Sequence, residues 1–448
     1  MGFLIDLIFG YKGKNDSVFD NARHMNAREE REIFTTKNIG FSVDGTARYL
    51  RKEVGYRGIV LCGVVGSGKS QLVITFLLLV KPEASIFLLD PSKEIRQRTE
   101  PYFKQHYNIK ILDWDNPIEN GSLQFNPLVW VKENMHRGGV DDFVELLIVC
   151  NRTEGTGKGD FWELSSKTPL KLLLLSLIHD GGQELDMNLE NLERILGWFD
   201  VQQQRLNAYV QKWLPVQYHE QYESFIGGTE PKVRKSIIAT CKSYLSMMSS
   251  ETMRYITNKD TLNLGSIRKG EKPTIVYVHI SENRMAKMKF LLSVLNSQLY
   301  SYLMEMPKPT DRDCIVVLEE FSSYHIDSFD KIAVTARKRR ITTILVLQDL
   351  NQIHAVYGKH GDTILSNMVS KIIFGGCGLK TSKYVEEYAG LTTVEHEGRM
   401  IERPLLSALS VRQLPSNQAV LLSGSMPIKI LKMRYWYEQR ALKRIAGK

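Results

Sequence analysis

The segment with the clearest capacity for chemistry is GVVGSGKS at residues 63–70. An apolar run at 59–62 precedes it and a helix-compatible run at 71–80 follows, which predicts strand, loop and helix in that order. In this arrangement backbone N–H groups and the helix N-terminus face phosphate, Lys69 reaches the β and γ oxygens, and the Ser70 hydroxyl binds Mg²⁺. The complete pattern predicts a site for ATP or GTP.

The residues expected around the phosphates are those of the loop and the first residue after it. Glycines within the loop allow the backbone to approach the ligand closely, because they have no Cβ. No guanine-reading motif such as Asn-Lys-x-Asp follows a strand, so the loop by itself leaves the choice of base open. The expected set is Gly63, Val64, Val65, Gly66, Ser67, Gly68, Lys69, Ser70 and Gln71.

A P-loop site needs acidic side chains on a neighbouring strand, and Glu319 and Glu320 are the candidates. They follow the apolar run 315–318, which predicts a buried strand. Adjacent strand positions point to opposite faces, so both carboxylates reach one site only if the strand end frays. We expect Glu319 to hold the Mg²⁺ shell and Glu320 to polarise the attacking water. The alternative is that both are solvated charges at a strand end.

Two further candidates surround the next apolar run, 342–347. Gln348 follows this predicted strand, and its amide is placed to sense the γ-phosphate through the attacking water. The run is preceded by TARKRR at 335–340. This basic cluster is compatible with solvated surface, with a nucleic-acid contact, or with an arginine finger that acts on a neighbouring subunit.

The elements that must position these residues form an α/β pattern. Strands alternate with helices, which predicts a mostly parallel sheet covered by helices on both faces. In such sheets ligands bind at the carboxyl ends of the strands, where Gly63, Glu319 and Gln348 all fall. The predicted strands are 59–62, 86–90, 274–279, 315–318, 342–347 and 371–374.

One region interrupts this pattern. Residues 186–260 show helical spacing and few strand signals, and they predict an inserted all-α domain. The expected organisation is an N-terminal segment 1–50, a nucleotide-binding domain made of 51–185 and 261–448, and the insertion. Aromatic residues of the insertion could stack on single-stranded bases, but at helical spacing we expect them in a core. They are Trp198, Tyr209, Trp213, Tyr218 and Tyr222.

Composition adds weaker constraints. A net charge of +9 favours anionic partners, because lysine and arginine release counterions from nucleic acid. The longest apolar stretches, 72–80 and 170–178, are far shorter than the ~20 residues of a membrane-spanning helix. The apolar start MGFLIDLIFG could dock on a partner or a membrane surface, or pack as a terminal element. The five cysteines are scattered without metal-binding spacing and indicate buried thiols.

Taken in order, these features resemble the VirD4/TraG family of type IV coupling proteins, the ATPases that feed DNA to conjugative secretion channels. The resemblance extends from about residue 20 to the end. Its further landmarks are NARHMNAREE at 21–30, FLLDPSKE at 87–94, LQFNPL at 123–128, DFWE at 160–163, VLQDLNQIHAVYG at 346–358 and SNMVSKIIFG from 366.

Two departures from the family pattern stand out. The family's acidic pair is usually Asp-Glu, whereas this chain has Glu319 before Glu320, which bears on metal geometry and rate. The family usually has membrane spans before the motor domain, whereas the roughly sixty residues before this loop contain no run long enough to span. The chain therefore resembles the span-less branch of the family.

The resemblance implies an ATPase of RecA-like fold that binds ATP and Mg²⁺. It implies that Lys69, Glu320, Gln348 and Arg337 are catalytic and that Ser70 and Glu319 hold Mg²⁺. Arg337 matches a family arginine that reaches a neighbouring subunit's nucleotide, which implies a hexamer around a DNA channel.

The resemblance also implies a set of partners. These are single- or double-stranded DNA, a relaxase, the channel components and a separate membrane anchor, for a cytoplasmic protein or one peripheral at the inner face of the membrane. Two other functions stay open, a nucleotide-gated receptor for protein substrates and a ring DNA motor of the HerA/FtsK type.

Overall fold

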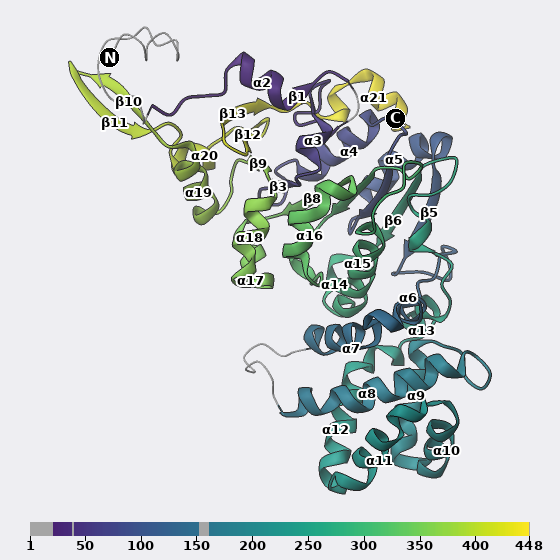
Figure 1. Ribbon diagram of the computed structural model, residues 1–448. Helices are drawn as coiled ribbons and strands as arrows, with labels where there is room; N and C mark the ends of the chain where they lie inside the picture. The colour runs from purple at the N-terminus through teal and green to yellow at the C-terminus, as the bar shows by residue number, and fades with distance from the viewer. Residues whose placement is uncertain (1–20, 38–39, 152–160, 448) are drawn as a thin grey trace.

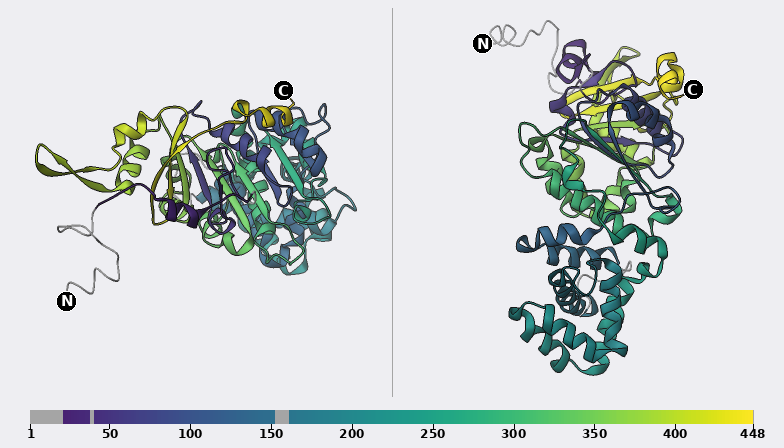
Figure 2. Two further views of the ribbon diagram at one scale, coloured as in Figure 1. Left: turned by 90° about the horizontal axis from the view of Figure 1, so that it is seen from above. Right: turned by 90° about the vertical axis from the view of Figure 1, so that its right-hand side faces the viewer.

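The computed structural model describes residues 21–37, 40–151 and 161–447, and the apolar first ten residues lie outside these ranges. Figure 1 shows two lobes, one built on a sheet with helices on both faces and one made of helices alone. The right-hand view of Figure 2 shows the helical lobe at one end of an elongated molecule. The last described residues of the chain, up to residue 447, belong to the sheet lobe.

A nine-stranded sheet organises the larger lobe, in the order β13-β12-β9-β3-β8-β7-β4-β6-β5. The seven strands from β9 to β5 are parallel, and β12 and β13 add antiparallel pairs at one edge. The strands are β3 Ile59–Cys62, β4 Ser85–Leu89, β5 Asn108–Asp113, β6 Thr274–His279, β7 Cys314–Leu318, β8 Ile341–Leu347, β9 Ser370–Phe374, β12 Gln418–Ser423 and β13 Met426–Lys432.

The predicted α/β class is confirmed, and all six predicted strands are present within one residue at each end. Their continuous apolar runs fit strands that are buried on both faces. Alternate residues of β3 enter different cores, Val60 and Cys62 on one face and Ile59 and Leu61 on the other. The remaining strands of this sheet, β5, β12 and β13, were not predicted from the sequence.

Helices cover both faces of this sheet (Figure 1). The helix α4, Lys69–Leu79, follows the glycine-rich loop, and eight of its eleven residues are buried, so it is a central packing element. Around the sheet lie α3 Lys52–Gly55, α5 Glu94–His106, α14 Glu282–Met285, α15 Lys289–Leu303, α16 Phe329–Thr335, α17 Asn351–Tyr357, α18 His360–Asn367, α19 Leu379–Ala389, α20 Ala408–Arg412 and α21 Arg440–Ile445.

The helical lobe lies between β5 and β6 in the chain. Its long helix α8 packs against α9, α10 and α12, so the helical body includes residues well before 186. The boundary at 186 stays a prediction, but this packing favours an earlier one. The helices are α6 Pro127–Glu133, α7 Gly139–Cys150, α8 Phe161–Asp180, α9 Leu189–Val201, α10 Gln203–Trp213, α11 His219–Gly228, α12 Pro231–Tyr244 and α13 Glu251–Asn258.

The aromatic residues of the lobe form its core, as expected. Trp198, Tyr209 and Tyr222 are buried, and Trp213 and Tyr218 pack against the same cluster from its edge. The Trp198 and Tyr209 rings meet edge to face with centroids 5.5 Å apart. These rings therefore stabilise the lobe and do not offer a stacking surface for bases.

Two smaller pieces complete the described chain. The N-terminal part contains α2 Ala27–Ile33, β1 Phe34–Thr35 and β2 Tyr49–Leu50. A hairpin of β10 Leu391–His396 and β11 Arg399–Pro404 projects from the sheet lobe, as the left-hand view of Figure 2 shows clearly. Across residues 21–37, 40–151 and 161–447, no helix has the length and apolar character needed to span a bilayer.

A buried lysine on β9 carries a cost in stability. Lys371 is 4% exposed, and its Nζ donates to the carbonyl of Met368 at 2.8 Å. Burial lowers its pKa to about 8 from 10.5. Burial of the charged ammonium lowers the stability of the fold by its full amount below pH 8. This loss of stability disappears between pH 8 and 10.5, because the folded protein releases the proton before the unfolded chain does.

We expect Lys371→Met to raise the free energy of unfolding at pH 7 by about 2 kcal/mol, because the charged ammonium is no longer buried. The gain should shrink as the pH approaches 10. Urea unfolding of both proteins from pH 7 to 10 measures it, with exposed Lys383→Met as control. A variant that is less stable than the parent at pH 7 would contradict this account.

Candidate nucleotide-binding site

The phosphate-binding loop joins β3 to α4 at the carboxyl edge of the parallel sheet. Gly66 and Gly68 have φ angles of 78° and 100°, a region that residues with a Cβ rarely adopt. A Cβ on Gly68 would lie 2.1 Å from the Tyr435 hydroxyl oxygen. Glycine at 68 is therefore required both by the backbone conformation and by the close approach of Tyr435.

Lys69 is folded into the loop. Its Nζ donates to the carbonyl oxygens of Gly63 at 2.5 Å and Val64 at 2.9 Å, and the residue is only 9% exposed. Burial lowers its pKa, while the nearby carboxylates of Glu319 and Glu320 act in the opposite direction. The ammonium is thus held at the centre of the loop and faces the acidic pair.

The two predicted magnesium ligands are in contact. The Ser70 hydroxyl donates to Glu319 Oε1 at 2.8 Å, across the interface between α4 and the end of β7. Glu319 is 6% exposed, and burial raises the pKa of its carboxyl to about 8, with Asp90 and Glu320 adding to the effect and Ser70 opposing it. A hydroxyl beside a buried carboxylate is an oxygen donor set that suits Mg²⁺. The residues present therefore fit this cation.

Glu319 and Glu320 lie beyond the end of the strand, so they are not constrained to point to opposite faces of the sheet. Strand β7 ends at Leu318, and Glu320 has φ 49° and ψ 43° at the start of a short 3₁₀ turn, Phe321–Ser323. This left-handed conformation is strained for a residue with a side chain. It turns Glu320 toward Gln348, whose Nε2 donates to Glu320 Oε1 at 3.3 Å.

Gln348 occupies the position after β8, next to β3 and β7 in the sheet. Its backbone N–H donates to Gln352 Oε1 at 2.9 Å, which fixes the turn that follows the strand. The structure therefore brings Lys69, Ser70, Glu319, Glu320 and Gln348 to one edge of the sheet. The roles assigned to them stay predictions.

Arg337 lies elsewhere. It is exposed in the turn Ala336–Arg339 that precedes β8, at the amino end of the strand whose carboxyl end leads to Gln348. Seven residues of strand separate the two ends by roughly 20 Å. Arg337 is thus outside the site of its own chain, and the predicted action on a neighbouring subunit is the geometry that this position allows.

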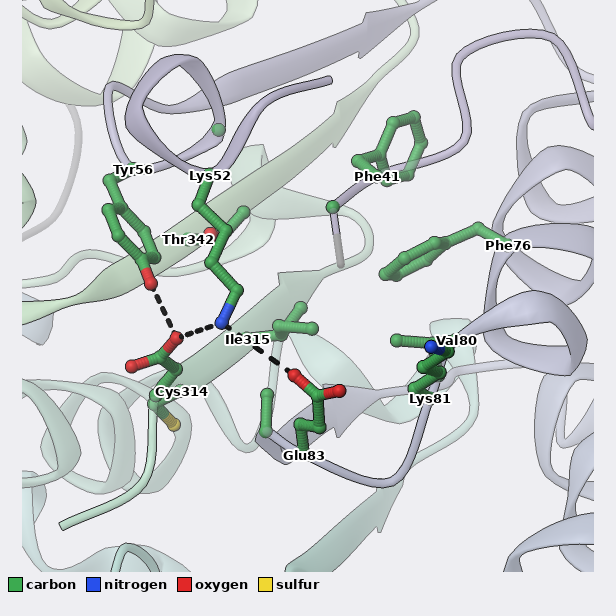
Figure 3. Close-up of a pocket in the computed structure, with 14 residues that line it drawn as sticks. Phe41, Lys52, Tyr56, Phe76, Val80, Lys81, Glu83, Cys314, Ile315 and Thr342 are labelled. Atoms are coloured by element: carbon green, nitrogen blue, oxygen red, sulfur yellow. Dashed lines mark hydrogen bonds and ion pairs between the residues drawn. The ribbon is translucent and has the colours of Figure 1, made fainter. Parts of the chain in front are cut away.

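An ion-pair network fixes the turn that holds Arg337. Asp313 accepts hydrogen bonds from Lys52 Nζ at 2.8 Å and Tyr56 Oη at 2.5 Å, beside a cavity of about 30 Å³ (Figure 3). Arg340 lies 3.7 Å from the other Asp313 oxygen. Burial would raise the pKa of Asp313, but the bonds from Lys52 and Tyr56 outweigh it and lower that pKa. Asp313 therefore ties α3 to the starts of β7 and β8.

One wall of the site was not predicted from the sequence. A cavity of about 500 Å³ adjoins the loop, and the C-terminal part of the chain closes its far side. No motif signals these residues; a run of three aromatics at 435–437 is the one visible cue. The cavity is lined by Gly66, Ser67, Gly68, Lys69, Ser70, Gln71, Glu94, Ser416, Asn417, Tyr435, Tyr437 and Glu438.

The family model described as Type IV secretory system Conjugative DNA transfer matches residues 12–447. Among curated proteins, the chain is 24% identical over 221 residues to Protein VirD4 of Agrobacterium fabrum and 23% identical over 221 residues to Protein VirD4 of Rhizobium rhizogenes. Each match covers 45% of this chain, and 33% and 32% of the respective relatives. The similarity thus spans about a third of the relatives' length.

Solved structures of plasmid coupling protein TrwB have the same fold. The complex of TrwB with ADP and Mg²⁺ has a TM-score of 0.72 at 16% identity and covers 95% of both chains. The complex with the non-hydrolysable ATP analogue ADPNP has a TM-score of 0.71 at 16% identity, covering 95% of this chain and 96% of TrwB. The predicted RecA-like P-loop fold is confirmed.

The contact between Ser70 and Glu319 predicts that Mg²⁺ binding depends on the length of the side chain at position 319. Glu319→Asp shortens the side chain by one methylene and withdraws the carboxylate from the Ser70 hydroxyl. We expect the affinity for Mg²⁺–ATP to fall about tenfold, as is typical when a metal-site carboxylate or its support is altered. Calorimetric titration with and without EDTA measures it, and metal-free ATP binding should not change. Equal Mg²⁺–ATP affinity in both proteins would show that the longer arm is not needed.

Proposed function

Because the chain belongs to the type IV secretory system conjugative DNA transfer family, we propose that it hydrolyses ATP to deliver relaxase-bound DNA to a secretion channel. The family that the sequence motifs indicated is confirmed. The observation that supports hydrolysis is the meeting of the Ser70–Glu319 and Glu320–Gln348 pairs at one sheet edge beside Lys69. Phosphate loop, metal ligands and water-binding groups then lie within one site.

The residues have distinct roles in this proposal. A bound Mg²⁺–nucleotide supplies a γ-phosphate with reduced electron density at phosphorus. Ser70 and Glu319 hold the cation, and the backbone N–H groups of the loop with Lys69 hold the phosphate oxygens. Glu320 accepts the proton of the attacking water, which Gln348 helps to orient.

The position of Arg337 supports assembly into a ring. An arginine at the opposite sheet edge cannot neutralise charge at its own γ-phosphate, so its catalytic role requires a second subunit. We infer a ring, with six subunits as the family resemblance implies. The net charge of +9 supports a polyanionic substrate inside such a ring.

The relaxase, the channel components and a membrane anchor are proposed partners on the same basis. The helical lobe also supports the alternative of a nucleotide-gated receptor for protein substrates. Val201 and Val216 on this lobe are 79% and 81% exposed. Their side chains can make apolar contacts with a protein. Binding of a protein substrate without any stimulation of ATPase activity by DNA would favour that alternative.

Removal of the proposed base should stop chemistry and spare binding. We expect Glu320→Gln to lower kcat of ATP hydrolysis by about 100-fold or more, because the glutamine amide cannot take the proton. Steady-state turnover with and without single- and double-stranded DNA measures it, with the surface substitution Glu305→Gln as control. The motor hypothesis fails if DNA never raises turnover of the parent protein, or if the variant keeps full activity.

Mixing of two inactive variants tests action between subunits. Arg337→Ala and Lys69→Ala should each lose ATPase activity, whereas Lys338→Ala, exposed in the same turn, should keep it. In mixed rings an intact loop of one subunit meets an intact arginine of the next, so part of the activity should return. Mixtures without any recovery, under conditions where the subunits assemble, would argue against a finger that acts in trans.

A further inference from the structure

We propose that the C-terminal segment 435–438 binds the base of the nucleotide and that the exposed ring of Tyr437 is the surface on which the base stacks. This inference rests on the proposed function, because it assumes that the phosphates occupy the loop. It identifies the ligand as a purine nucleoside triphosphate and assigns a binding role to residues outside every motif of the sequence.

The cavity beside the loop gives the base its place. Its volume of about 500 Å³ lies within the range of ligand sites in proteins, roughly 300 to 1,000 Å³. One side consists of the loop and the start of α4 up to Gln71, and the other consists of Tyr435, Tyr437 and Asn417. A nucleotide whose phosphates lie on the loop can extend its base across this cavity to the aromatic wall.

The two tyrosines are arranged as a stacking platform. Their ring centroids are 5.5 Å apart with an interplanar angle of 28°. Tyr435 is 6% exposed and lies against Gly68, whereas Tyr437 is 42% exposed. The buried ring thus supports the exposed one, which is the one available to a third planar group.

The segment is fixed to the phosphate-binding helix. Trp436 Nε1 donates to Gln71 Oε1 at 2.8 Å, and the Trp436 backbone N–H donates to Thr75 Oγ1 at 2.9 Å. The Arg98 guanidinium lies over the Trp436 ring, 5.3 Å from its centroid. Because the helix α4 begins at Lys69, these contacts hold the aromatic wall at a constant position relative to the phosphates.

The chemistry of the wall favours purines without selecting one of them. Stacking reads the face of a base, which adenine and guanine share, and a large ring system gains more from it. The Glu438 carboxylate is engaged with the Tyr435 backbone N–H at 2.8 Å. The exposed amide of Asn417 both donates and accepts, so it can pair with either purine. We therefore expect ATP and GTP to bind with similar affinity.

Inorganic tripolyphosphate separates the base from the phosphates in a direct test. In the full chain, Tyr437→Ala should weaken Mg²⁺–ATP and Mg²⁺–GTP about tenfold or more by calorimetry, and leave Mg²⁺–tripolyphosphate binding unchanged. Tyr437→Phe should restore both nucleotides, because it keeps the ring. Tyr255→Ala, a half-buried tyrosine of the helical lobe, is the matched control.

Two results overturn the inference. One is an unchanged ATP affinity in Tyr437→Ala, and the other is an equal loss for ATP and tripolyphosphate, which would mean that the substitution disturbs the loop itself. Failure of the proposed function looks different, because the parent protein would then show no DNA-stimulated ATP hydrolysis, whatever the comparison of ATP with tripolyphosphate gives.

Discussion

The hydrogen bond between Ser70 and Glu319 is the contact on which the arrangement of the site depends. It joins residues 249 positions apart, one at the start of α4 and one at the end of β7. Strand β8 lies between β3 and β7 in the sheet, so this bond spans the strand that leads to Gln348. The order of the strands thereby places Gln348, the proposed γ-phosphate sensor, between the phosphate loop and the acidic pair.

The same contact explains the electrostatics of the edge. Burial opposes ionisation of Glu319 most strongly, and the charges of Asp90 and Glu320 lie close enough to act in the same direction. Lys69 is held nearby with its ammonium bonded to loop carbonyls. A divalent cation and a polyphosphate bring opposite charges that relieve both conditions. The site is thus most favourable electrostatically when both are present.

Much of this could be predicted from the sequence because the information was local. The six predicted strands are built mainly of consecutive apolar residues, and the loop motif specifies its own backbone conformation. Strand β5, Asn108–Asp113, escaped because its first four residues are exposed or half-buried and its sequence alternates with polar residues. The tyrosines of the cavity escaped because their place beside the loop depends on the contact of Tyr435 with Gly68, 367 positions away, which no spacing rule encodes. Glu320 was predicted in part. A frayed strand end was expected from the sequence, but the left-handed backbone conformation of Glu320 was not.

The position of Arg337 and Gln348 at the two ends of β8 has a consequence for the behaviour of a ring. In the proposed ring, a single extended strand would connect Gln348, the proposed sensor of the nucleotide in its own subunit, with Arg337, the residue proposed to act on the next subunit. Strands in the middle of a parallel sheet are stiff along their length, so a displacement at one end is transmitted to the other. In the proposed ring, each subunit would then receive a signal at one edge and pass it on at the opposite edge. Assembled head to tail, such subunits would form a circuit with an intrinsic direction, in which the order of ATP hydrolysis around the ring follows from the polarity of the strand.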